Sequence, residues 1–84
     1  MIAKFVKELE GWASDARLFE LSPELEGNQF VVVSQVKAEF SGWETYIFSS
    51  DKNGRVDEFT EIGNSQRGVI SHEDILKEIG YEIK

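Results

Sequence analysis

Apolar residues near the start of the chain recur at the spacing of an amphipathic helix. The residues at positions i, i+3, i+4 and i+7 of this segment are Ile2, Phe5, Val6 and Leu9. Charged residues separate them, which would place the charges on the opposite face of a helix. We therefore expect a helix over residues 2–11 that ends at Gly11.

The middle of the chain alternates apolar and polar residues, a pattern typical of β-strands. The segments that show it predict strands over residues 16–21, 29–40, 44–50 and 55–62. Segment 16–21 is interpreted as a strand because Ser22-Pro23 follows it, and the residue before a proline avoids the α region. The first half of 29–40 is apolar at successive positions, which favours a central strand covered on both faces.

Asn53-Gly54 is the strongest turn signal in the sequence, because both residues accept a positive φ between two apolar runs. A hairpin with a loop of these residues alone would pair Lys52 with Arg55. A type I turn over residues 51–54 with a bulge would shift that register. The sequence leaves both forms of the hairpin open.

A second helix is predicted over residues 72–79. Ser71 precedes it, and Asp74 follows Ser71 at the spacing of a capping box. Gly80 is placed to end the helix in the left-handed conformation. Residues 82–84 are then available for a short edge strand.

These elements predict one α+β domain over residues 1–84. We expect a four-stranded antiparallel meander sheet with the N-terminal and C-terminal helices packed on the same face. The chain is short, so its core is thin and its stability modest.

The charge and composition limit the kinds of partner. Sixteen acidic against nine basic residues give a net charge of −7, which repels nucleic-acid backbones and anionic membranes at long range. We expect no direct nucleic-acid binding, no membrane association, and a monomer or weak dimer. The first residues carry charges too frequently for a signal peptide, so a cytoplasmic location is expected.

No catalytic or metal-binding constellation stands out. The chain has no cysteine, and His72 is its single histidine. His72-Glu73 lacks the second histidine of a zinc-protease motif, since Leu76 stands at that position. We therefore expect no enzyme activity, no catalytic residues, no cofactor and no metal, and His72 is interpreted as a polar residue of a helix's first turn.

The candidate interaction residues are a tryptophan, an arginine and a group of acids. Trp43 follows Gly42 beside a turn, where its ring would be partly exposed, and exposed tryptophans are enriched at binding hot spots. Arg67 lies in a loop between glycines and could reach a carboxylate or phosphate. The acids are Asp57, Glu58 and Glu61. Burial of Trp43, and an ion pair that fixes the loop of Arg67, are the competing interpretations.

Several stretches together form a recognisable pattern over most of the chain. They are Ala16–Pro23, Leu25–Gly27, Val31–Ser34, Phe40–Gly42, Glu44–Phe48, Asn53–Val56, Gly63–Gly68, His72-Glu73 and Gly80–Glu82. In this pattern the chain resembles a family of small uncharacterised proteins common in bacteriophages and in the actinobacteria that they infect. The chain departs from the family pattern at Glu24 and Trp43, where prolines are expected. The resemblance implies a phage or prophage setting and brings no activity or site residues with it.

We therefore expect a small acidic phage-encoded protein that binds a host protein and modulates it without catalysis, in the cytoplasm of a bacterial host. A nucleic-acid mimic that inhibits a defence protein is an alternative. It is disfavoured because basic residues are interspersed among the acids. A virion or assembly component that associates through edge strands is another alternative.

Overall fold

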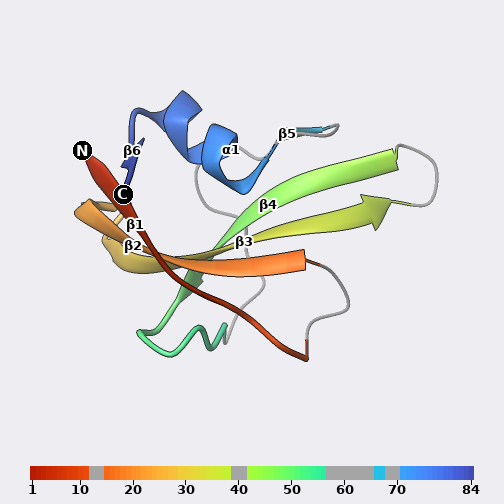
Figure 1. Cartoon of the computed structure of the whole chain (residues 1–84), viewed down its shortest axis with the longest axis horizontal. Coiled ribbons are helices and arrows are strands. Elements are labelled where there is room, and N and C mark those ends of the chain that lie inside the picture. The colour runs from red at the N-terminus through yellow and green to blue at the C-terminus, as the bar shows by residue number, and fades with distance from the viewer. Residues whose placement is uncertain (12–14, 39–41, 57–65, 68–70) are drawn as a thin grey trace.

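The computed structural model describes residues 1–11, 15–38, 42–56, 66–67 and 71–84 (Figure 1). In these segments the chain forms a β-sheet and one helix. The elements are β1 (Ile2–Glu8), β2 (Asp15–Leu25), β3 (Asn28–Ala38), β4 (Gly42–Ser50), β5 (Gln66–Arg67), α1 (His72–Ile79) and β6 (Glu82–Ile83).

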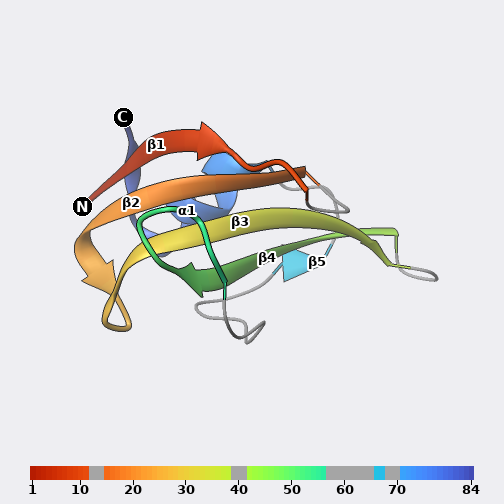
Figure 2. The same ribbon diagram turned by 90° about the horizontal axis from the view of Figure 1, so that it is seen from below.

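The strands of the described residues form one six-stranded sheet in the order β5-β4-β3-β2-β1-β6. Neighbouring strands are antiparallel except for β6, which is parallel to β1. Both outer strands contain only two residues. The sheet is therefore mixed, with the long strands β2, β3 and β4 side by side within it (Figure 2).

The predicted fold class is wrong in two respects. The sheet is mixed and larger than a four-stranded antiparallel meander, and one helix, not two, packs against it within the described segments. The chain is thus richer in β-structure than its hydrophobic periodicity indicated.

The helix predicted over residues 2–11 is a strand. Residues 2–8 form β1, and β1 pairs with β2 from Ile2 opposite Ser22 to Glu8 opposite Arg17. Val6 has no partner in β2, so β1 contains a β-bulge. The extra residue shifts the alternation of the strand, and the resulting apolar spacing imitates that of a helix. A short helix without packing on its apolar face would be unstable, whereas pairing with β2 satisfies the backbone of β1.

The other strands agree with the sequence more closely. Strand 16–21 lies within β2, which continues through the cis Ser22-Pro23 peptide to Leu25. Strand 29–40 corresponds to β3, which is central as expected, although its residues 39–40 lie outside the described residues. Strand 44–50 lies within β4, which already begins at Gly42. The strand predicted over residues 55–62 is not present at residues 55–56. Residues 57–62 lie outside the described part of the chain.

The sheet buries apolar side chains on both faces. On the face covered by α1, here called the helix face, the buried sheet residues are Ala3, Phe19, Leu21, Val31, Val33 and Ile47, which pack against Ile75, Leu76 and Tyr81. On the opposite face, here called the loop face, Ala16, Leu18 and Val32 are buried beneath Leu9 and Val56. Figure 1 shows α1 on one side of the sheet and segment 51–56 on the other. Burial on both faces explains why the first half of β3 is apolar at successive positions.

The turn after β4 spans residues 51–54, as in the second of the two predicted forms. The backbone N–H of Gly54 donates to the Asp51 carbonyl at 3.1 Å, and that of Asp51 donates to Arg55 at 3.1 Å. Gly54 has a φ of +87°, and a Cβ there would lie 2.5 Å from Leu9 Cδ2. The backbone conformation therefore favours glycine at this position, and any larger residue would also displace the Leu9 side chain.

The C-terminal helix is confirmed with its predicted bounds. The Ser71 hydroxyl accepts a hydrogen bond from the Asp74 backbone N–H at 3.0 Å. Gly80 ends α1 with a φ of +115°. The next backbone N–H, that of Tyr81, donates to the Leu76 carbonyl at 3.0 Å, which closes the C-terminal turn. The predicted edge strand after Gly80 is also present, as β6.

Candidate functional site

The structure describes only the backbone of two predicted interaction residues. Trp43 lies in β4 opposite Lys37 of β3, and Arg67 lies in β5 opposite Glu44 of β4. Because Glu44 follows Trp43 directly, the backbones of Trp43 and Arg67 are close at the same end of the sheet. The acids Asp57, Glu58 and Glu61 lie outside the described residues. Their role as interaction residues stays a prediction.

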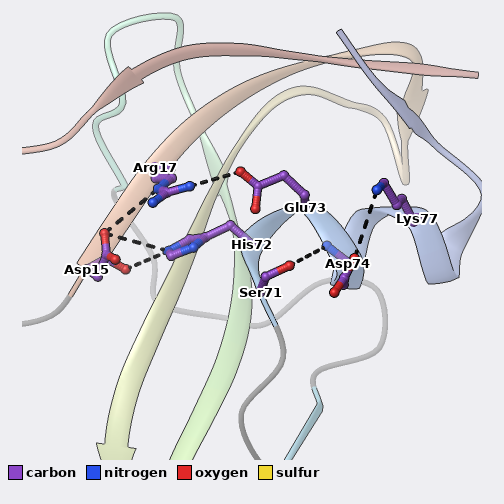
Figure 3. Close-up of polar contacts among 7 residues, drawn as sticks. All are labelled: Asp15, Arg17, Ser71, His72, Glu73, Asp74 and Lys77. Atoms are coloured by element: carbon purple, nitrogen blue, oxygen red, sulfur yellow. Dashed lines mark hydrogen bonds and ion pairs between the residues drawn. The ribbon is translucent and has the colours of Figure 1, made fainter.

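A polar cluster joins β2 to the first turn of α1 (Figure 3). Arg17 Nη1 donates to Glu73 Oε1 at 2.9 Å, and Arg17 Nε lies 3.9 Å from Asp15 Oδ1. His72 is buried, with 3 % of its surface exposed. Its Nε2 lies 3.0 Å from the Asp15 backbone carbonyl, to which the ring N–H donates, and 3.8 Å from Asp15 Oδ1.

The hydrogen bonds of this cluster hold the start of α1 against β2. Ser71, next to His72, accepts the hydrogen bond that caps the helix. Arg17 Nε is buried without a hydrogen-bond partner, while both nearby carboxylates repel an anion from it. Among the described side chains no group of three or more potential ligands could hold a metal ion. The cluster instead connects the start of α1 to the sheet.

Strand β1 presents an apolar surface that the sequence analysis assigned to the core. The large apolar residues exposed in the described chain are Met1 at 55 %, Ile2 at 41 %, Phe5 at 42 % and Val6 at 41 %. We call these four residues the β1 surface, although Met1 precedes the strand itself. Ala3 is buried, whereas the other residues of β1 are exposed. Phe5 remains in edge-to-face contact with buried Phe19, with ring centroids 5.8 Å apart.

The β1 surface lies where the sheet is only partly covered by its last strand. The backbone N–H of Phe5 donates to the Lys84 carbonyl, and that of Lys84 donates to Ala3. β6 pairs with Ile2 and Ala3, whereas β1 continues to Glu8. Within the described segments no strand pairs with residues 6–8 on this outer side.

Open depressions lie at both ends of β1. A depression of about 450 Å³ is lined by Lys7, Glu8, Leu9, Glu10, Asn53, Gly54 and Arg55. Another, of about 470 Å³, is lined by Ile2, Lys4, Glu20, Leu21, Ser22, Pro23, Glu24 and Gln29. Both mix acidic and basic side chains, so neither selects a small ligand of one charge. Because the two depressions border β1, the surface around this strand is uneven.

Sequence reasoning missed the β1 surface because it assigned the wrong secondary structure. In a helix, Ile2, Phe5 and Val6 would share one buried face; in β1 the bulge at Val6 breaks that relation. The β-branched and aromatic character of Ile2, Phe5 and Val6 is a weak signal for a strand, and it depends too much on context to outweigh the helical spacing.

The comparisons with known proteins found no relative of this chain. No protein-family model matches the sequence, and neither a curated protein nor a solved structure matches it significantly. In the part of the chain that the structure describes, no helix is long and apolar enough to cross a membrane. Functional inference therefore depends on the residues and their geometry.

Proposed function

We propose that this chain is a small, acidic, phage-encoded protein that binds a host protein without catalysing a reaction. The observation that supports this proposal is the β1 surface, where the apolar side chains of Met1, Ile2, Phe5 and Val6 are about half exposed within and next to one strand. Phe5 contacts Phe19 on the helix face, and Ile2 lies on the other face because side chains alternate along a strand. Large apolar side chains left exposed in this way are candidates for contact with a partner protein.

The size of the β1 surface indicates the kind of complex. The four partly exposed side chains are distributed over both faces of β1, so neither face presents a large apolar patch by itself. A standard protein interface takes about 800 Å² from each partner. We therefore propose the β1 surface as the centre of a larger interface that includes the surrounding polar residues.

The setting of this function follows from the sequence resemblance to small phage and actinobacterial proteins. In that setting the partner is a protein of the bacterial host, and the complex forms in the host cytoplasm. Trp43 and Arg67, at the far end of the sheet from β6, form a second candidate contact region.

No specific observation favours the alternative functions. Assembly through edge strands is opposed at β1 by the bulge at Val6 and by Lys4 and Lys7, since bulges and lysines discourage pairing between sheet edges. Mimicry of nucleic acid requires a continuous acidic surface, and these lysines interrupt one along β1.

Affinity capture from a host lysate tests the proposal with a substitution at the exposed Val6. The wild-type chain, Val6→Ile and Val6→Asp would be immobilised in parallel. Lys77→Gln, at an exposed position of α1, is the control because it changes the net charge by the same amount as Val6→Asp. We expect one host protein to be captured by every variant except Val6→Asp.

Binding of the purified host protein is then measured by isothermal titration calorimetry. We expect Val6→Asp to weaken it at least about tenfold, because a charged group would be buried in an apolar contact. Circular dichroism must show that Val6→Asp is folded. Capture of no specific protein, or equal capture by Val6→Asp, would contradict the proposal.

A further inference from the structure

The turn that covers the loop face contains a chemically reactive pair, Asn53-Gly54. An asparagine side chain can react with the backbone nitrogen of the next residue, and glycine permits this best because it has no Cβ to obstruct the approach. Asn53 is exposed, so its side chain is open to water. Nothing in the proposed function requires Asn53, so its chemistry is a separate property of the chain.

The reaction is spontaneous deamidation. The Gly54 backbone nitrogen loses its proton and attacks Asn53 Cγ, a C–N bond forms, and the side-chain amide leaves as ammonia. Water then opens the cyclic imide at one of its two carbonyls. The product is aspartate, or isoaspartate in which the backbone runs through the former side chain.

The native turn holds the attacking nitrogen away from this reaction. The Gly54 N–H donates to the Asp51 carbonyl at 3.1 Å, and this bond must break before the nitrogen can turn toward Asn53 Cγ. Asp51 Oδ1 also accepts from the backbone N–H groups of Asn53 at 2.8 Å and Arg55 at 2.9 Å. The Arg55 and then the Asn53 hydrogen bonds lower the pKa of Asp51 below its ordinary value of 3.8, so the carboxylate that organises the turn is ionised at neutral pH.

Packing outside the turn restricts it further. A Cβ on Gly54 would lie 2.5 Å from Leu9 Cδ2, and Gly54 is itself buried. The Leu9 side chain therefore lies close against Gly54, and it also packs against the loop-face core, so opening of the turn separates Gly54 from this packing. The hydrogen bonds to Asp51 and the contact with Leu9 act on the same peptide.

We infer that Asn53 is a deamidation site whose rate is controlled by opening of the 51–55 turn. The modification adds one negative charge beside Asp51. In the isoaspartyl product it also lengthens the turn backbone by a methylene, so the hydrogen bonds to Asp51 no longer fit. A single opening that leads to reaction thus leaves a permanent change in the segment over the loop face.

Peptide mapping by mass spectrometry after incubation at mildly alkaline pH tests this inference on the full chain. We expect Asn53 to deamidate at least about tenfold more slowly in the folded protein than in the same protein in urea, since reaction proceeds from the locally opened form. Asn28, which is followed by Gln29, provides an internal comparison because it lacks the glycine.

Substitutions of Asp51 test whether the structure of the turn, and not only the Asn-Gly sequence, sets the rate of deamidation at Asn53. Asp51→Ala removes the side-chain acceptor and should accelerate deamidation several-fold, whereas Asp51→Asn retains an acceptor oxygen and should leave it slow. If Asp51→Ala does not fold, Leu9→Ala supplies the same test from the other side of Gly54. Equal rates in the folded and urea-unfolded protein, or no acceleration in a folded variant with a loosened turn, would overturn the inference.

Discussion

Tyr81 connects the end of α1 to the far end of β2. Its hydroxyl donates to the Pro23 carbonyl at 2.7 Å, and its backbone N–H donates to the Leu76 carbonyl. Only 2 % of its surface is exposed. A tyrosine suits this position because its ring fills the helix-face core while its hydroxyl donates to the Pro23 carbonyl, in the part of β2 where pairing with β3 is interrupted.

Stability should fall at alkaline pH because of Tyr81. Burial raises the pKa of the Tyr81 hydroxyl above its ordinary value of 10.0. The unfolded state therefore loses this proton at lower pH than the folded state, and the stabilisation is complete below about pH 10 and is lost as the pH rises through the folded pKa. Urea denaturation across this range should show the decrease.

Tyr81→Phe is the variant for this measurement. It should cost about 0.5–1.5 kcal/mol at neutral pH, because the Pro23 carbonyl loses its donor. The variant should also show a weaker decrease in stability above about pH 10 than the wild type. An identical alkaline profile in the two proteins would show that Tyr81 is not the group responsible.

At the scale of elements, α1 is specified by local signals that agree with one another. Ser71 begins it, Gly80 ends it, and acidic Glu73 and Asp74 lie in its first turn, where they interact favourably with the helix dipole. These signals depend on neighbouring residues, so the sequence was sufficient to predict the helix with its bounds.

Removal of the helix cap should have a measurable cost. Ser71→Ala leaves the Asp74 backbone N–H without its acceptor and should destabilise the chain by about 1 kcal/mol. Ser71→Asp retains a capping oxygen and serves as the control. Thermal unfolding of the three proteins measures the difference; equal stability of Ser71→Ala and the wild type would mean that the cap contributes nothing.

β1 shows the opposite case, in which an element depends on its surroundings. Its apolar spacing satisfies the helical pattern because Val6 is an extra residue opposite β2. The bulge exists only in relation to β2, so no pattern within residues 2–8 reveals it. The same error concealed the β1 surface, which is the basis of the proposed function.

At the scale of the whole molecule, the sheet is covered on both faces. Leu18 and Leu76 have no exposed surface, yet they lie on opposite sides, with Leu18 on the loop face and Leu76 beside the helix face. A sheet with both helices on one side, as the sequence predicted, would leave the position of Leu18 open to solvent. Leu9 and Val56 provide the second cover instead.

Leu18→Ala therefore tests the two-sided core. We expect it to cost about 2–5 kcal/mol, similar to Leu76→Ala, because each truncation leaves a cavity in a buried cluster. A chain of this length has a total stability of roughly 4–13 kcal/mol, so either variant should unfold at a much lower urea concentration. A cost for Leu18→Ala below about 1 kcal/mol would indicate that the loop face is not closed.

The sequence by itself determined the features that act between near neighbours: the capped helix over residues 72–79, the alternating strands that became β2, β3 and β4, and the absence of cysteine or a second histidine for metal chemistry. Only the tertiary structure decided that residues 2–8 form a strand, that β6 runs parallel to β1, and that Ile2, Phe5 and Val6 are exposed. Caps and alternation follow from local backbone geometry. The partner of a strand, and the exposure of its side chains, depend on which sheet edges and faces are still uncovered once the rest of the chain has packed.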